Sequence, residues 1–374
     1  MEKRVYDMAY YHGYYRRKSS GDNIMNMRTY LVLYWVILFC CTSSAAAKEF
    51  RVGVLYWSMN IPGQVAMRKG LENECTRINA AAKKNGDLTM ILEPRVAGDG
   101  QKGIENQIRQ MMELIEAGVD LLIVQPTDNA ALAAPLRQAN ASKIPVIAYD
   151  QYISGGTLTA YRTSDNYQAG YLNGEYIASR FPKEKEIHII MVEYPHVSST
   201  VERVNGFIDA LNKSGQTYKM IKTYTAVEPV SGKKAGEDIL RDFPKKGSVD
   251  VVFTVNDGGG LAVVDALAAA GRNEIQVASI DGDPVSVNNI RTGRLTVIDS
   301  AQYCGQLGAE AIKAGYAVLC GEKPPFHALV PVFPITVETL TMYQGWSGPV
   351  AENFIKPWRS VSPEWQGSLR ILKN

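Results

Sequence analysis

Histidine and cysteine are scarce in this 374-residue sequence, and neither sign of charge is in excess. The chain holds four histidines and five cysteines, and its formal net charge is +2. No apolar run reaches the roughly 20 residues that a membrane-spanning helix needs. The charge balance excludes proteins that depend on a basic excess to bind nucleic acid or an anionic membrane surface. What remains is an ordinary globular composition in a chain long enough for two substantial cores.

The scarce residues also form no catalytic or metal-binding pattern. Downstream of residue 47 the chain holds only three residues of each type, His188, His196, His327, Cys75, Cys304 and Cys320. The histidines have no nucleophile or metal-ligand partner at a recognisable spacing, and the cysteines match no zinc or CxxC pattern. We therefore expect no catalytic residue, no metal site and no cofactor. The cysteines allow one disulfide with one thiol left over, and free buried thiols are the default expectation.

The first 47 residues differ from the rest of the chain in charge and pattern. They hold six basic and three acidic residues, whereas the remainder holds 34 and 35. Arg28 precedes a 12-residue apolar stretch, Tyr30 to Cys41, and small residues follow up to Ala47. This order is typical of a secretory signal peptide cleaved after Ala47, and the stretch is too short for a membrane anchor. We therefore expect a protein secreted to the periplasm.

Apolar strands and amphipathic helical patterns alternate from residue 50 onward. Phe50–Tyr56 has the pattern of a strand, and Met67, Leu71 and Cys75 then fall on one helical face. The same order repeats as far as a strand predicted at Leu329–Val332. Strands separated by helices indicate parallel sheets with helices on both faces, and roughly ten strands favour two similar lobes over one sheet. The tail that follows is interrupted by glycine and proline, so we expect it to wrap the surface.

Three of the apolar strands end in hydrogen-bonding side chains. Asp150, Asn256 and Asp281 each follow a buried-strand run, whereas Asp257 is expected to cap the helix beginning at Gly258. Ligands of open parallel α/β sheets bind in the crevice beyond the carboxyl ends of the strands. Three polar groups from strands far apart in sequence therefore predict one polar pocket.

Several short motifs then follow one another in a characteristic order. They are Gln125-Pro126-Thr127-Asp128, Ile144-Pro145-Val146-Ile147-Ala148-Tyr149-Asp150, Thr163-Ser164-Asp165-Asn166, Glu202-Arg203-x-x-Gly206-Phe207, Asn256-Asp257, Ile280-Asp281-Gly282 and Gly293-Arg294-Leu295. Each is weak alone, but the ordered set, from about Arg51 to about Val337, resembles the type I periplasmic binding proteins. Within that family the resemblance is to the ribose/galactose-like branch.

The resemblance implies an α/β fold of two Rossmann-like lobes with parallel sheets, joined by a three-strand hinge and closing on a small ligand. By analogy, the chain divides into a leader, two discontinuous lobes and a tail. The leader is 1–47, the N-terminal lobe 48–162 plus 303–332, the C-terminal lobe 163–302 plus 333–342, and the tail 343–374. Because fold alone does not determine function, the site depends on individual residues.

The resemblance also implies which side chains contact the ligand. Asp150 matches a carboxylate that accepts hydrogen bonds from sugar hydroxyls, and Asn256 and Asp281 match the same role. Gln302 matches a hinge-strand amide that reaches the ligand, and Gln125 matches a polar residue of the cleft. The alternatives are helix capping or a loop salt bridge for the acids and solvated surface for the glutamines.

Aromatic residues that stack on a sugar ring are missing from their family positions. In the turn after the first strand, Gly63 and Gln64 stand in their place, and Glu228 stands where another aromatic residue is common. Tyr56 and Trp57, at the end of the first strand, are candidates to replace the lost stacking. A core or rim position is the alternative for both rings.

Arginines are missing as well, because Gln151 and Val201 stand where the family carries guanidinium groups. Their loss changes which ligand oxygens can be bound and makes the cleft less positive. We therefore expect a modified sugar, a polyol, an aminated ligand or a signalling molecule rather than plain ribose or glucose.

Two functions use lobes that close in this way. One is a monomeric solute-binding protein for an ABC importer, whose permease recognises the closed form. The other is a periplasmic sensor that presents the closed form to a receptor kinase or chemoreceptor. A DNA-binding repressor of the same fold is excluded, because residues 1–47 contain a secretion signal and no helix-turn-helix. We expect no nucleic-acid partner and no enzymatic activity.

Overall fold

A computed structural model describes residues 49–352, 354–360 and 363–372 of the protein. The predicted signal peptide and its cleavage after Ala47 lie outside these residues and stay predictions. Within the described ranges, none of the helices combines the length and the apolar character that crossing a bilayer requires.

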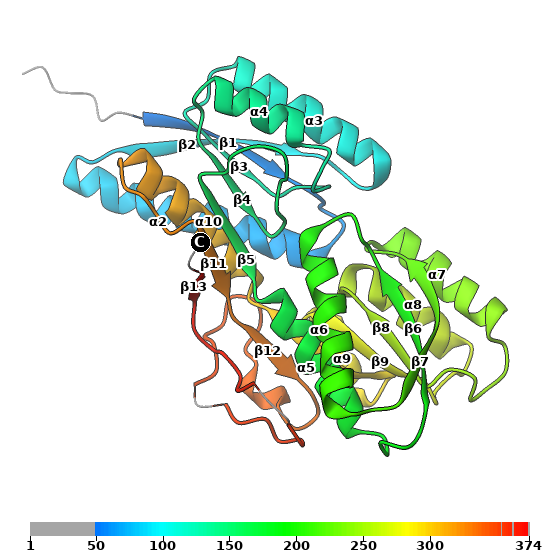
Figure 1. The fold of residues 1–374 in the computed structure, drawn as a ribbon. Helices are drawn as coiled ribbons and strands as arrows, with labels where there is room; N and C mark the ends of the chain where they lie inside the picture. The colour runs from blue at the N-terminus through cyan, green and yellow to red at the C-terminus, as the bar shows by residue number, and fades with distance from the viewer. Residues whose placement is uncertain (1–48, 353, 361–362, 373–374) are drawn as a thin grey trace, which may run out of the picture. The chain divides into compact units, whose positions relative to one another are not determined.

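The first of two sheets has seven strands in the order β13-β11-β5-β4-β3-β1-β2 (Figure 1). Every neighbouring pair is parallel except β13 and β11. The strands are β1 (Glu49–Tyr56), β2 (Thr89–Val96), β3 (Leu121–Val124), β4 (Val146–Tyr149), β5 (Ala160–Ser164), β11 (His327–Val330) and β13 (Arg370–Leu372). Helices α2 (Pro62–Asn85) and α10 (Cys304–Leu319) cover one face, and α3 (Gly100–Glu116) and α4 (Ala133–Ala141) cover the other.

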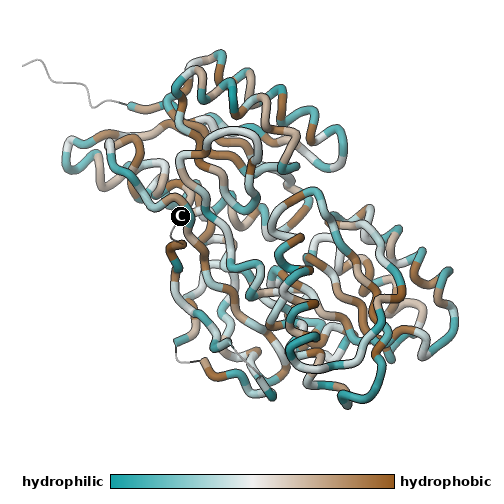
Figure 2. The backbone as a smooth tube through the Cα atoms, viewed as in Figure 1, coloured by the Kyte–Doolittle hydropathy of each residue, from teal (hydrophilic) through white to brown (hydrophobic). Residues whose placement is uncertain are grey.

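The second sheet has six strands in the order β12-β10-β9-β8-β6-β7, and only β12 runs antiparallel to its neighbour. The strands are β6 (Ile187–Glu193), β7 (Tyr218–Thr225), β8 (Val251–Thr254), β9 (Gln276–Asp281), β10 (Thr296–Gln302) and β12 (Val332–Ile335). Its helices are α5 (Asn166–Ser179) and α6 (Ser198–Ser214) on one face and α7 (Pro229–Asp242) and α8 (Asp257–Ala269) on the other, with α9 (Pro284–Thr292) after β9. Hydrophobic residues follow the central strands of both sheets (Figure 2).

The predicted fold class of two α/β lobes with mostly parallel sheets is confirmed. The chain passes from the first sheet to the second after β5, returns after β10, and passes again between β11 and β12. These three passages correspond to the three-strand hinge that the resemblance implies. The residue boundaries of the lobes stay predictions.

Two features at the end of the chain differ from the sequence-based expectation. Leu329–Val332 is not one strand, because the chain breaks at Pro331 into β11 of the first sheet and β12 of the second. Proline lacks the N–H group that a continuous ladder needs. The tail also adds a short strand, β13, whose three residues pair with β11 at the edge of the first sheet. A three-residue strand carries too little pattern to be recognised in sequence.

Helices α5 and α6 pack at backbone distance because glycines face each other between them. A Cβ atom at Gly170 would clash with the carbonyl oxygen of Arg203, and one at Gly206 would clash with that of Tyr167. This contact fixes the position of α6 on the second sheet, and with it the direction of the Arg203 side chain.

We expect Gly206→Ala to lower the free energy of unfolding by about 1–3 kcal/mol, because the methyl group forces two helix backbones apart. Asn205→Ala, one residue earlier on the exposed side of α6, is the matched control and should change it by less than about 0.5 kcal/mol. Urea denaturation of both variants measures the difference. Equal midpoints for Gly206→Ala and the wild type would contradict the close packing.

Candidate ligand-binding site

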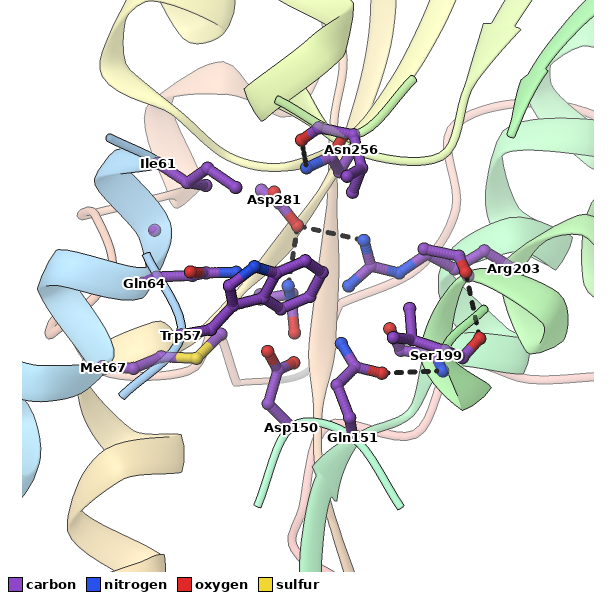
Figure 3. A pocket seen from close by; sticks show the side chains of 15 residues that line it. Trp57, Ile61, Gln64, Met67, Asp150, Gln151, Ser199, Arg203, Asn256 and Asp281 are labelled. Atoms are coloured by element: carbon purple, nitrogen blue, oxygen red, sulfur yellow. Dashed lines mark hydrogen bonds and ion pairs between the residues drawn. The ribbon is translucent and has the colours of Figure 1, made fainter. Parts of the chain in front are cut away.

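A narrow cavity with a free volume of about 30 Å³ lies where the carboxyl ends of both sheets meet (Figure 3). The first sheet and its helices supply one wall, which consists of Trp57, Ile61, Gly63, Gln64, Met67, Asp150 and Gln151. The second sheet and its helices, with the hinge strand β10, supply the other, which consists of Val197, Ser199, Thr200, Arg203, Val227, Asn256, Asp281 and Gln302. Polar strand ends from both sheets therefore share one pocket.

Seven of the ten side chains expected at the site line this cavity. They are Gln64, Trp57, Asp150, Gln151, Asn256, Asp281 and Gln302, whereas Tyr56, Gln125 and Glu228 are not part of the lining. The contact of each with a ligand stays a prediction.

Asp150 is buried at the turn after β4, with 3% of its surface exposed. Its φ of 64° lies in the left-handed region, which aspartate tolerates better than most residues. The Gln125 amide Nε2 donates to Asp150 Oδ2 at 3.0 Å, and Gln125 Oε1 accepts from the backbone N–H of Trp57 at 3.2 Å. Gln125 thus stands behind the cavity and orients two residues of its lining. Burial raises the pKa of Asp150, and the bond from Gln125 partly opposes that rise.

Asp281 is buried on the opposite wall, and a cation stands beside it. Arg203 Nη1 lies 3.1 Å from Asp281 Oδ1, and Gln302 Nε2 donates to the same oxygen at 2.6 Å. Figure 3 shows Arg203 and Asp281 turned toward each other across the top of the cavity. Arg203 also donates to the Val255 carbonyl at 2.7 Å and to Asn166 Oδ1 at 3.0 Å, so its guanidinium is heavily engaged. Burial raises the pKa of Asp281, and the charge of Arg203 opposes this.

Arg203 was not among the residues expected at the site, because the Glu202-Arg203-x-x-Gly206 motif indicated only the family. The spacing holds a usable signal, because residues three apart share a helix face and Gly206 is small enough to suit a helix contact. An arginine on such a face is held near the start of the helix, beside the strand ends.

The side-chain oxygen of Gln302, Oε1, is a buried hydrogen-bond acceptor without a donor in the described part of the chain. Only 3% of the surface of Gln302 is exposed. Buried polar atoms without a partner are rare in native proteins, and a ligand or a water usually completes them. Gln302 therefore has one amide atom committed to Asp281 and one available.

Asn256 lines the cavity but is also a helix cap. Its Oδ1 accepts from Gly259 N at 3.2 Å, and its Nδ2 donates to the Val227 carbonyl at 2.8 Å. The expectation that Asp257 caps this helix was wrong, because α8 begins at Asp257 and the cap lies one residue earlier. Asp257 is instead buried, where it accepts hydrogen bonds from Ser279 and from the backbone of Asp283.

Tyr56 and Glu228 have partners away from the cavity. The Tyr56 hydroxyl donates to Glu72 Oε1 at 3.3 Å, and the Arg68 guanidinium lies 4.9 Å from the centre of its ring. Glu228 caps α7, where its carboxylate accepts from the backbone N–H groups of Val230 and Ser231. Of the two candidate rings, only Trp57 reaches the pocket.

The rims of the two walls are hydrogen-bonded to each other. Ser199 N donates to Gln151 Oε1 at 3.1 Å, and Tyr152 N donates to Ser198 Oγ at 3.0 Å. A third bond joins Asn129 N to the His196 carbonyl at 3.1 Å. A volume of about 30 Å³ has room for no more than one or two water molecules. These bonds therefore hold a closed arrangement that must open to admit anything larger.

Other chemistry is not assembled in the described part of the chain. Among residues 49–352, 354–360 and 363–372, no group of three histidine, cysteine or acidic side chains is arranged to hold a metal ion. The three described cysteines are free thiols, with Cys75 and Cys304 buried and Cys320 exposed.

Known proteins resemble this chain over most of its length. Residues 52–323 match the family model described as "Periplasmic binding protein domain". The ribose import binding protein RbsB of Bacillus subtilis (strain 168) is 28% identical over 272 residues, which are 72% of this chain and 83% of that protein. The ribose import binding protein RbsB of Salmonella typhimurium is 27% identical over 301 residues, 80% of this chain and 95% of that protein.

The fold is also similar to that of solved structures. A solute-binding protein of an ABC transporter from Bacillus halodurans C-125, with bound myo-inositol, aligns with a TM-score of 0.68. It is 22% identical, and the alignment covers 80% of this chain and 98% of that one. A myo-inositol-binding protein of Caulobacter, 24% identical, aligns over 79% of this chain and 96% of that one with a TM-score of 0.65.

Beneath the Asp281–Gly282 turn lies a second pair of buried acids, Asp257 and Asp299. Asp299 Oδ1 accepts from the backbone N–H of Gly282 at 2.9 Å, and its side chain is fully buried. Burial and the neighbouring charge of Asp299 raise the pKa of Asp257 well above its usual range. The turn that presents Asp281 therefore depends on an acceptor at position 299.

We expect Asp299→Ala to lower the free energy of unfolding by about 1–3 kcal/mol, because it leaves the buried Gly282 N–H without an acceptor. Asp299→Asn keeps an acceptor oxygen and removes a negative charge beside Asp257, so it should cost clearly less. Chemical denaturation at neutral pH ranks the two variants. Equal destabilisation by alanine and asparagine would show that the Gly282 bond is not the important contact.

Proposed function

This chain belongs to the type I periplasmic binding proteins, in the ribose/galactose-like branch, and we propose that it captures a sugar or polyol between its lobes for delivery to an ABC importer. The ligand would be bound by Asp150 and Gln151 on one wall and by Asp281 and Gln302 on the other. In this proposal the protein acts as a monomer in the periplasm, after removal of the predicted leader.

One observation carries the proposal, namely that each wall delivers a buried carboxylate to the same cavity. Asp150 and Asp281 are 3% and 5% exposed, and both end or follow a strand. A carboxylate accepts several hydrogen bonds, so it suits the adjacent hydroxyl groups of a sugar or polyol. Trp57, Ile61 and Met67 add apolar surface that a ring's C–H face can contact.

Ligand capture follows from this division of the site between two lobes. When the rims separate, each wall carries half of the hydrogen-bonding groups. A ligand that contacts both walls stabilises the closed form relative to the open form by its differential affinity. The rims, which bonds from Ser199 to Gln151 and from Tyr152 to Ser198 join in this structure, then approach each other around the ligand, over a space wider than the present cavity. A permease that recognises both rims in this arrangement would discriminate loaded protein from empty protein.

The charges of the cavity narrow the class of ligand. Its lining holds two carboxylates and one guanidinium, and that guanidinium is engaged by Asp281, Val255 and Asn166. Asp150 is bonded by an amide, and in the described part of the chain no cation forms an ion pair with it. The site therefore favours ligands rich in donors, such as polyols and sugars, including those with an amino group. Phosphorylated or acidic sugars are disfavoured, because the two carboxylates would repel their negative charge.

A thermal-shift screen tests the capture of a sugar or polyol. D-Ribose, D-allose, myo-inositol, L-arabinose and D-glucosamine are the first compounds, and we expect at least one to raise the melting temperature by mass action. Asp150→Asn should weaken its binding by about 10- to 100-fold, because a charged acceptor becomes a neutral one. Asp87→Asn, at an exposed acid that is not part of the cavity lining, is the matched control and should bind as the wild type does.

Calorimetric titration of both variants with the compound that gives the largest shift measures these affinities. If no sugar, polyol or amino sugar shifts the wild-type melting temperature, the proposed ligand class is wrong. If binding occurs and Asp150→Asn leaves it unchanged, the class stands and the assigned site falls.

The raised pKa values of the two cavity carboxyls predict that binding of a neutral sugar or polyol strengthens with pH. Burial raises the pKa of Asp150, and that of Asp281 to about 7, in the ligand-free protein. Hydroxyl donors favour the charged carboxylates, so binding lowers these pKa values and releases protons. Each unit of lowering corresponds to about a tenfold change in affinity. Affinity should therefore fall as the pH drops from 8 to 5.

Titrations in buffers of different ionisation enthalpy, repeated between pH 5 and 8, measure both the affinity and the proton release. Proton uptake on binding, or affinity that rises as the pH falls, would contradict charged carboxylates as the acceptors.

A further inference from the structure

The C-terminal tail contacts the residue that presents a carboxylate to the cavity. The indole Nε1 of Trp346 donates to the backbone carbonyl of Asp281 at 2.7 Å, and the Tyr343 hydroxyl lies 3.4 Å from the carbonyl of Gly282. The Asp281 side chain lines the cavity while its carbonyl is held by the tail. Residues 343–348, called the strap below, are thus separated from the cavity only by Asp281.

Asp281 needs such support because its backbone is strained. Its φ is 132°, a positive value that residues with a side chain rarely adopt. A strained conformation persists only when its surroundings hold it on several sides. Here the Asp281 carbonyl accepts from Trp346, its carboxylate is bonded by Arg203 and Gln302, and the next N–H, that of Gly282, donates to Asp299. Trp346 is the one of these four partners that the tail supplies.

The strap is also bonded to the other lobe. The Trp346 carbonyl accepts from the backbone N–H of Gly305 at 3.1 Å, and the Gly348 carbonyl accepts from Gln306 Nε2 at 3.1 Å. Both donors lie at the start of α10, which packs closely on α2 through Gly308. Helix α2 carries Gln64 and Met67 of the first wall. A single tryptophan therefore links the two walls, with its side chain on one and its backbone on the other.

The remainder of the tail is anchored independently of the site. Glu175 of α5, 1% exposed, accepts from Lys356 Nζ at 2.7 Å, from Trp358 Nε1 at 3.1 Å and from Ser360 Oγ at 2.7 Å. Strand β13 then pairs with β11 on the first sheet. The tail thus makes a fourth passage between the sheets, in addition to the three hinge strands.

We propose that Trp346 is a positioning residue for Asp281, and that the strap couples occupation of the cavity to the closed arrangement of the lobes. This inference rests on the proposed function. The strap holds the Asp281 carbonyl, which fixes the direction of its carboxylate, and it holds α10 at the same time. Because coupling is reciprocal, a ligand bound by Asp281 must in turn stabilise the strap.

Trp346→Phe tests this, because it keeps an aromatic ring and removes the N–H donor. D-Ribose, D-allose, myo-inositol, L-arabinose and D-glucosamine are titrated again, and for each one that shifts the wild-type melting temperature we expect binding weaker by about three- to tenfold. Trp358→Phe is the matched control, since it removes an indole donor from the same tail at Glu175, away from the cavity. It should lower the melting temperature to a similar extent and leave the dissociation constant within twofold of the wild type.

Hydrogen exchange on the full-length protein gives a second readout that a purely structural contact would not move. Saturation with the same compound should slow exchange in residues 343–348 and at Gly305, and leave residues 354–360 unchanged. In Trp346→Phe this protection should be reduced.

The outcomes separate the inference from the proposed function. If wild-type protein binds and Trp346→Phe binds equally well, with no protection of the strap, the positioning role is wrong and the proposed function stands. Equal losses of affinity in Trp346→Phe and Trp358→Phe would also overturn it, because the effect would then be general destabilisation. If the wild type binds none of the compounds, the proposed function fails and the inference fails with it.

Discussion

The buried ion pair between Arg203 and Asp281 is the interaction on which most of the site depends. A carboxylate removed from water is costly unless a cation and further hydrogen bonds compensate it, and here both are supplied. Arg203 can supply the cation only because α6 lies against α5 at backbone distance, which the glycines at 170 and 206 permit. The same arginine bonds Asn166 at the start of α5, so the pair also ties the helix contact to the strand end. The packing of α6 on α5 thus also determines where the positive charge lies in the cavity.

The two cavity carboxylates are alike in burial and unlike in compensation. Asp281 has a guanidinium at 3.1 Å, whereas Asp150 has the amide of Gln125. Asp150 therefore has no cation at ion-pair distance in the described part of the chain, although the more distant charge of Arg203 also opposes the rise of its pKa. The asymmetry gives the walls different tasks. In the proposed function, the second lobe holds an acceptor that Arg203 and Gln302 already bond, and the first offers an acceptor that only amide groups bond.

Much of the fold could be predicted from sequence because four-residue runs such as Leu121–Val124 are apolar throughout, as strands buried on both faces must be. The positions of Asp150 and Asp281 were predicted from the same pattern, since a polar residue at the end of such a run lies at the carboxyl end of its strand. Arg203 could not be predicted in this way, because its direction is set by a helix contact with residues far away in the chain. The cap of α8 was misplaced by one residue because Asn256 and Asp257 are both good capping residues.

The tail shows the same limit on a larger scale. Its sequence has no strong periodicity that would predict its contacts. The indole N–H groups of its tryptophans donate to acceptors far away in the chain, which are Asp281, Glu175 and Val332. Each of these acceptors belongs to the second lobe or to the hinge strand that enters it, whereas β13 and the contacts with α10 belong to the first. A segment bonded on both sides of a hinge lowers the free energy of the hinge angle that satisfies both sets of bonds. Because the described contacts coincide with hydrogen-bonded rims, the proposed coupling predicts that the tail favours closure before any ligand is bound, so that a ligand needs to supply only the remainder.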